Sequence, residues 1–191
     1  MSQDVSAIRT VLEAFSLRVH LYDLVQKRNA LEVLAGDLPG AEYVILCCHG
    51  SGTLDGVPRL RLEVIDQADG DYDQAGGWEQ AEIEMTPANI PDHFRGRGRT
   101  LICIGCGSGQ EAFAQAFLRA GFRAYIAPRG SGTHTNATLL FIAGFFYHLL
   151  AATRVYDEPL PHTDQEAVLL AAQADPEYTR GTRTYHYYSE A

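Results

Sequence analysis

Two short motifs place residues that can do chemistry directly after apolar runs. Residues 43–52 read YVILCCHGSG and residues 100–109 read TLICIGCGSG, so His49 follows one run and Cys106 ends the other. A cysteine attacks a carbonyl carbon as its thiolate, and a neighbouring imidazole can accept or shuttle the proton. The two residues therefore predict acyl transfer through a thioester, of which the simplest example is peptide hydrolysis.

The residues around the two motifs fit this chemistry. Glycines beside both residues allow a substrate backbone to approach closely, and the N–H groups of Gly50 and Cys106 can form an oxyanion hole. Ser108 with Glu111 predicts a capping box and a helix directly after Cys106, where the helix N-terminus favours a thiolate. The same residues also permit a purely structural role, because buried cysteines are commonly inert.

The elements that must position these residues alternate along the chain. The apolar runs at 43–48 and 100–105 are typical of parallel strands covered on both faces. Further strands are expected at 16–25, 124–127 and 182–188, and helices at 29–35, 87–94, 108–120, 135–152 and 163–174. This order predicts an α/β fold with a mainly parallel sheet, helices on both faces and a site beyond the carboxyl ends of the strands.

The segment 59–85 differs from the rest of the chain. Residues 59–65 and 82–85 resemble short strands of a hairpin, but residues 63–84 hold eight acids and no base. We interpret this stretch as an acidic insertion in a single domain of residues 1–191. Asp69, Asp71 and Asp73 begin like a calcium-binding EF-hand loop. Gln74 and Gln80 then replace the glycine and glutamate that such a loop requires, which favours a solvated loop.

Composition narrows the class of protein. A chain of 191 residues suits one domain, and its formal charge of −9 disfavours nucleic acid or an anionic membrane as a partner. Residues 1–30 carry charges throughout and lack the apolar core of a signal peptide. The apolar run 137–152 is shorter than the ~20 residues of a membrane span. We therefore expect a cytoplasmic protein with reduced thiols, and the sequence leaves open whether it forms a homodimer.

The ordered motifs resemble a known family. YVILCCHGSG and LICIGCGSG are similar to caspase-like (clan CD) cysteine peptidases, and especially to bacterial CHAT-type domains, in which one strand ends in His-Gly and a later one in Cys followed by Ser/Thr-Gly. The resemblance continues through AFLRAGFRAYIAP (116–128) and FIAGFFYHLL (141–150), and it covers roughly residues 16–52 and 100–152. It implies a three-layer caspase-like sandwich, a peptide or protein substrate and no cofactor.

The resemblance also implies roles for single residues. Cys106 corresponds to the nucleophile, His49 to the general base and Gly50 to the oxyanion-hole glycine. The family builds its S1 pocket from three places, which here hold Lys27 or Arg28, Ile104, and Arg129. Their cations favour an acidic P1 side chain, whereas Asp23 near the same loop favours a basic one. His134 lies in a loop near the expected substrate.

Two departures from the family pattern concern activity more than fold. Gly105 stands where metacaspase-like members have an aspartate, and the segment from Cys106 to the following helix is very short. A caspase-like scaffold without turnover is therefore the main alternative.

Two further alternatives are weaker. LICIGCGSG imitates the glycine-rich motif of S-adenosylmethionine-dependent methyltransferases, but the next strand lacks their ribose-binding acid. Cys103 and Cys106 form a C-x-x-C motif beside Cys47 and Cys48. Adjacent or oddly spaced side chains on a strand point to opposite faces, which disfavours zinc binding or dithiol redox chemistry.

Overall fold

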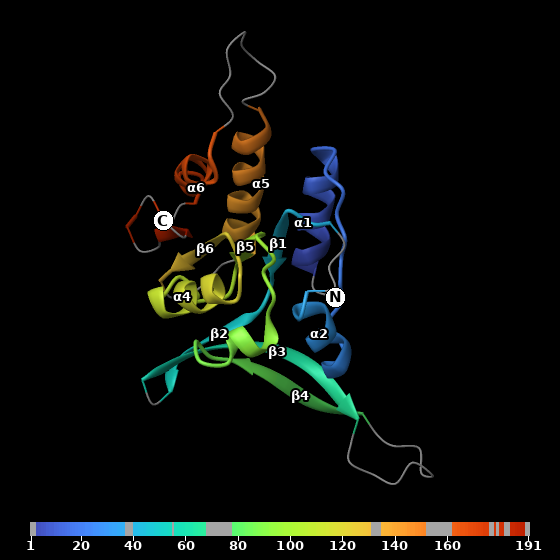
Figure 1. Cartoon of the computed structure of the whole chain (residues 1–191). Coiled ribbons are helices and arrows are strands. Elements are labelled where there is room, and N and C mark those ends of the chain that lie inside the picture. Colours follow the sequence, from blue (N-terminus) through green and yellow to red (C-terminus); the bar gives the residue numbers. More distant parts are fainter. Residues whose placement is uncertain are drawn as a thin grey trace.

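The computed structural model describes residues 3–36, 40–54, 56–67, 78–130, 135–151, 162–175, 178, 180–181 and 184–189. These residues form a mixed α/β fold with two sheets, and Figure 1 shows the smaller sheet below the larger one. The described elements in chain order are α1 (Gln3–Ala14), α2 (Lys27–Leu34), β1 (Tyr43–Leu46), β2 (His49–Leu54), β3 (Val57–Gln67), β4 (Trp78–Met85), α3 (Ile90–His93), β5 (Thr100–Cys103), α4 (Glu111–Arg119), β6 (Ala124–Arg129), α5 (Thr135–Ala151), α6 (Asp164–Ala172) and β7 (Thr184–Ser189).

The larger sheet has four strands in the order β1-β5-β6-β7. The strands β1, β5 and β6 run parallel, and β7 pairs with β6 in the antiparallel direction. The prediction of a mainly parallel sheet is thus confirmed. The apolar run at 100–103 forms the central strand β5, all of whose residues are buried.

Alternate residues of the central strands face two separate hydrophobic clusters. Leu101 and Tyr125 pack with α4 in one cluster, which also contains buried residues of α2. Ile102 and Ile126 pack with α1, α5 and α6 in the other. Helices therefore cover both faces of the sheet, as the alternation of strands and helices predicts.

The smaller sheet contains the strands β2, β3 and β4 in antiparallel order. Its alternate residues Leu60, Leu62 and Val64 are buried against Ala30 and Leu34 of α2, so much of the segment 59–85 belongs to the core. The hairpin strands expected at 59–65 and 82–85 are confirmed by the pairing of β3 with β4, whereas the expectation that this stretch lies outside the core is wrong for these strands. The acidic run with Asp69, Asp71 and Asp73, together with the calcium hypothesis, lies outside the described residues.

The segment 16–25, predicted as the first strand, forms no strand. This segment follows α1. Its end is hydrogen-bonded to the smaller sheet, because the N–H group of Ile65 donates to the carbonyl group of Val25 at 2.6 Å. The run at 43–48, expected to be central, supplies the edge strand β1. The segment expected to be a strand of the main sheet therefore contacts β3 of the smaller sheet at its end.

Helix boundaries agree with the local signals in most places. Thr163 and Glu166 form the predicted capping box of α6, and Gly121 has the positive φ of 89° expected after α4. The capping box predicted at Ser108 is wrong, since α4 begins at Glu111 after the N-cap residue Gln110. The strand β6 continues through Pro128, although proline was expected to end it. The pairing of β5 with β6 stops before Pro128, so the N–H group that proline lacks is not needed for a hydrogen bond between these strands.

Candidate functional site

The two motifs meet where the chain leaves β1 and β5. These strands are parallel neighbours with Leu46 opposite Cys103, so the residues that follow them lie at the same edge of the sheet. A Cβ atom on Gly50 would lie only 1.6 Å from the carbonyl oxygen of Cys106. The backbones at these two residues are therefore in direct contact, and only glycine fits at position 50.

The loop between β5 and α4 is held from both sides. A Cβ atom on Gly105 would lie 2.9 Å from the sulfur of Cys48. The buried Ser108 hydroxyl donates to the carbonyl group of Gly105 at 2.7 Å, and the N–H group of Gly109 donates to the carbonyl group of Pro128 at 2.8 Å. The glycines that we expected to admit a substrate backbone thus admit the protein's own backbone.

His49 occupies the first position of β2 instead of the end of a buried strand, which corrects the sequence-based expectation. It pairs with Arg61 across the antiparallel ladder. The His49 side chain is 75% exposed, and its Nε2 atom lies 3.8 Å from Oε1 of Glu63. The imidazole therefore has room to change rotamer, and in this structure it faces a carboxylate.

Cys106 is half-buried in a turn. It precedes the first residue of α4 by five positions, so the thiol does not lie at a helix N-terminus. The dipole of α4, which the sequence suggested as a source of thiolate stabilisation, acts mainly within one turn of the helix end. Activation of this thiol therefore depends more on a neighbouring base.

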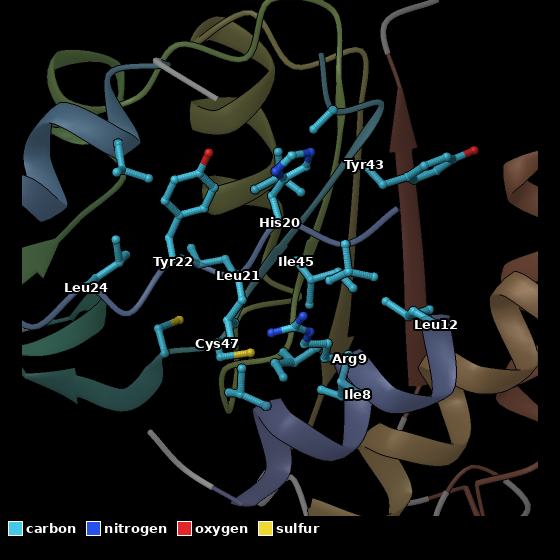
Figure 2. Close-up of a pocket in the computed structure, with 18 of the residues that line it drawn as sticks. Ile8, Arg9, Leu12, His20, Leu21, Tyr22, Leu24, Tyr43, Ile45 and Cys47 are labelled. Carbon is cyan, nitrogen blue, oxygen red and sulfur yellow. The ribbon is translucent and has the colours of Figure 1, made fainter. Parts of the chain in front are cut away.

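A cavity of about 1470 Å³ connects the two motifs with the N-terminal part of the chain. Five of the predicted site residues line it, namely Cys106, His49, Gly50, Ile104 and Asp23. Figure 2 shows how α1 and the segment 17–25 close the cavity, with the side chains of Ile8, His20, Tyr22 and Ile45 among those around it. The sequence analysis did not predict the helix α1 on this side of the cavity, although the spacing of the buried residues Ile8 and Leu12 indicates a helix.

The predicted cationic residues of the S1 pocket lie elsewhere. Lys27 pairs with Asp66 (Nζ to Oδ2, 2.9 Å), and the exposed Arg28 pairs with Glu32 on α2. Arg129 is exposed at the end of β6, and His134 lies outside the described residues. The charged residues that line the cavity are Asp23, Glu42, Glu63, Arg9, Arg18, Arg61 and Arg95.

The four cysteines divide into two sets. Cys47 packs with the cluster around α5, and Cys48 packs with the cluster around α4, as expected of adjacent residues on a strand. The sulfurs of Cys48 and Cys103 lie 3.7 Å apart, a contact between neighbouring strands that the sequence analysis missed. Within the described ranges, no three His, Cys, Asp or Glu side chains gather closely enough to hold a metal ion.

Comparison with known proteins found no match among family models, curated proteins or solved structures. In the described part of the chain, no helix is both long enough and apolar enough to cross a membrane. The choice of a function therefore depends on the two motifs and on their geometry.

Proposed function

We propose that this protein is a caspase-like cysteine hydrolase of the CHAT type, acting as an endopeptidase with Cys106 as nucleophile and His49 as general base. The observation that carries the proposal is the backbone contact between Gly50 and Cys106, which joins the two motifs at one edge of the sheet. The mainly parallel sheet with helices on both faces supports a caspase-like sandwich.

The proposed reaction has two steps. The Cys106 thiolate attacks the substrate carbonyl carbon, and the N–H groups of Gly50 and Cys106 stabilise the oxyanion. The imidazolium of His49 then gives its proton to the leaving amine, which leaves a thioester on Cys106. A water molecule, activated by His49, hydrolyses this thioester and restores the thiol.

This chemistry requires a local rearrangement at the start of β2. The Cβ direction of Gly50 points at Cys106, whereas the adjacent His49 faces Glu63, so its imidazole reaches Cys106 only if the backbone at the first residue of β2 shifts along with the rotamer. Catalytic contacts are commonly loose before a substrate binds, so the observed orientation fits a resting state.

The cavity supports a peptide as the substrate. Its lining is largely apolar and extends from Cys106 to Ile8, which suits an elongated ligand with several side chains. Asp23, Glu42 and Glu63 line the cavity, but so do Arg9, Arg18, Arg61 and Arg95. The charge of the lining therefore favours neither a basic nor an acidic P1 side chain, and the P1 preference is left to the peptide screen.

Alkylation by limiting iodoacetamide at several pH values, mapped by mass spectrometry, tests the two catalytic roles. We expect Cys106 to react first near neutral pH, and we expect His49→Ala to slow it about tenfold by removing the base. The matched control is His20→Ala, since His20 lines the same cavity. Slow reaction of all four cysteines, or equal effects of the two variants, would contradict the proposal.

A scaffold without turnover is the second candidate. It is favoured by the orientation of His49 toward Glu63 and by the distance of Cys106 from the start of α4. A screen of peptides with basic, neutral and acidic P1 residues, with Cys106→Ala as the inactive control, separates the two. Cleavage by the wild type alone supports the hydrolase, and cleavage by neither protein supports the scaffold.

A further inference from the structure

Cys48 and Cys103 form a pair of thiols next to the loop that holds Cys106. The sulfurs of Cys48 and Cys103 are 3.7 Å apart, within contact distance. Cys103 is fully buried in β5, whereas Cys48 is partly exposed and lines the cavity. A small oxidant that enters the cavity therefore meets Cys48 first and must pass it to reach the sulfur of Cys103.

The surroundings of this pair favour an anionic sulfur. Burial raises the pKa of Cys103, but hydrogen bonds from Cys48 and from the backbone of Gly105 outweigh it and lower the pKa to about 7. The hydrogen bond to Cys103, together with burial, raises the pKa of Cys48. Of the two sulfurs, that of Cys103 therefore loses its proton more readily, while Cys48 keeps its proton, a combination that favours oxidation to a disulfide.

We propose that Cys48 and Cys103 are a redox-active dithiol that hydroperoxides convert to a disulfide, independently of whether Cys106 is a catalytic nucleophile. Once a local opening of the loop admits hydrogen peroxide to the buried sulfur, the Cys103 thiolate attacks one oxygen of the peroxide, the O–O bond breaks, and a sulfenic acid and hydroxide form. The second thiol attacks the sulfenic sulfur, an S–S bond forms, and water leaves. Two electrons pass from the dithiol to the peroxide, which ends as two molecules of water.

The disulfide requires a local movement of the loop. The sulfurs must approach from 3.7 Å to the S–S bond length of about 2.05 Å. Gly105 packs against the Cys48 sulfur, and Cys106 follows Gly105, so this movement reaches the candidate nucleophile. Cys48 also directly precedes His49 in the chain. The disulfide thus links the two chain segments that hold the motifs, and we expect it to change the alkylation rate of Cys106.

The test oxidises the full chain with equimolar hydrogen peroxide and then blocks the remaining thiols with N-ethylmaleimide in denaturant. Free thiols should fall from four to two per chain. A peptide map without reduction should show a cross-link of Cys48 to Cys103, reversed by dithiothreitol. Cys47→Ala is the matched control and should keep this cross-link. Cys48→Ala should abolish it while the far-ultraviolet circular dichroism stays unchanged.

Two results would overturn the proposal. The first is a peptide map of the oxidised chain in which Cys48 and Cys103 remain free thiols while Cys47 or Cys106 is oxidised. The second is a cross-link that joins Cys48 or Cys103 to a different cysteine or to another chain, which a non-reducing gel detects. If Cys48→Ala loses ordered structure, the peptide maps of the wild type and of Cys47→Ala decide the question. The proposal requires that both maps show the cross-link of Cys48 to Cys103.

Discussion

Replacement of Gly50 by alanine tests whether the two motifs really touch. The new methyl carbon would lie 1.6 Å from the carbonyl oxygen and 2.5 Å from the carbonyl carbon of Cys106. Real Cβ atoms essentially never approach a heavy atom more closely than 3.0 Å, so the two backbones must separate by about 1.4 Å. Neither neighbour is the flexible end of a side chain, and the cost of this movement falls on the backbone.

The expected loss of stability follows from this clash. Overpacking in a well-packed region costs about 1–3 kcal/mol, and we expect Gly50→Ala at the upper end, about 3 kcal/mol. With a urea dependence of about 2 kcal/mol per molar, the unfolding midpoint falls by about 1.5 M. Because the separation moves Cys106 away from His49, the alkylation rate of Cys106 should fall as well.

The matched control is Gly56→Ala, at the turn between β2 and β3. Gly56 has a positive φ of 75°, but a Cβ atom there has no neighbour within 4 Å. It should cost only the strain of the left-handed conformation, about 1–2 kcal/mol. Equal urea midpoints for the two variants, or a Gly50→Ala midpoint equal to that of the wild type, would refute the backbone contact and the site built on it.

Three other perturbations probe the site and the fold. Glu63→Gln should raise the alkylation rate of Cys106 by up to about fivefold, because it removes an exposed contact with His49 that is worth at most about 1 kcal/mol. A slower rate would instead show that Glu63 orients the base. Thr163→Ala should cost about 1 kcal/mol in urea unfolding, because it removes the capping box of α6, whereas Thr163→Ser should be nearly neutral. Hydrogen bonds from Cys48 and Gly105 hold the pKa of the buried Cys103 below its usual range, at about 7, so this thiol should add stability as the pH rises from 7 to 9, and that contribution should be lost as the pH falls through 7. Urea unfolding should show a steeper rise for the wild type than for Cys103→Ala over this range, and parallel curves would contradict the expectation.

Local signals in the sequence predicted many of the elements. The apolar run at 100–103 gave a buried strand, and Thr163 with Glu166 gave a helix start, because both signals act within a few residues. The hairpin expected at 59–65 and 82–85 is likewise present as β3 and β4, but the many acids around Leu60, Leu62 and Val64 wrongly suggested that it lies outside the core. Elements whose form depends on distant partners were less predictable. The segment 16–25 has strand-like alternation, yet its contact is with β3.

The candidate site was partly predictable for the same reason. Parallel neighbouring strands bring the residues after their carboxyl ends together, and this rule placed Gly50 and Cys106 at one edge. The rule does not fix side-chain directions, so it did not show that His49 faces Glu63. Nor does a pattern within one strand reveal a contact between strands, which is why the pair Cys48 and Cys103 was missed.

The order of strands in the larger sheet has a consequence for the path of folding. The strands β5 and β6 are joined by α4 alone, whereas β1 reaches β5 only after the whole of β2, β3, β4 and α3. Closing the longer loop costs more entropy, so we expect β5 and β6 to pair before β1 docks. In a refolding chain, the strand that holds Cys103 would then pair with β6 before Cys103 meets Leu46 and Cys48. The times at which these two thiols become protected from a pulse of alkylating reagent would therefore record when the edge of the sheet closes.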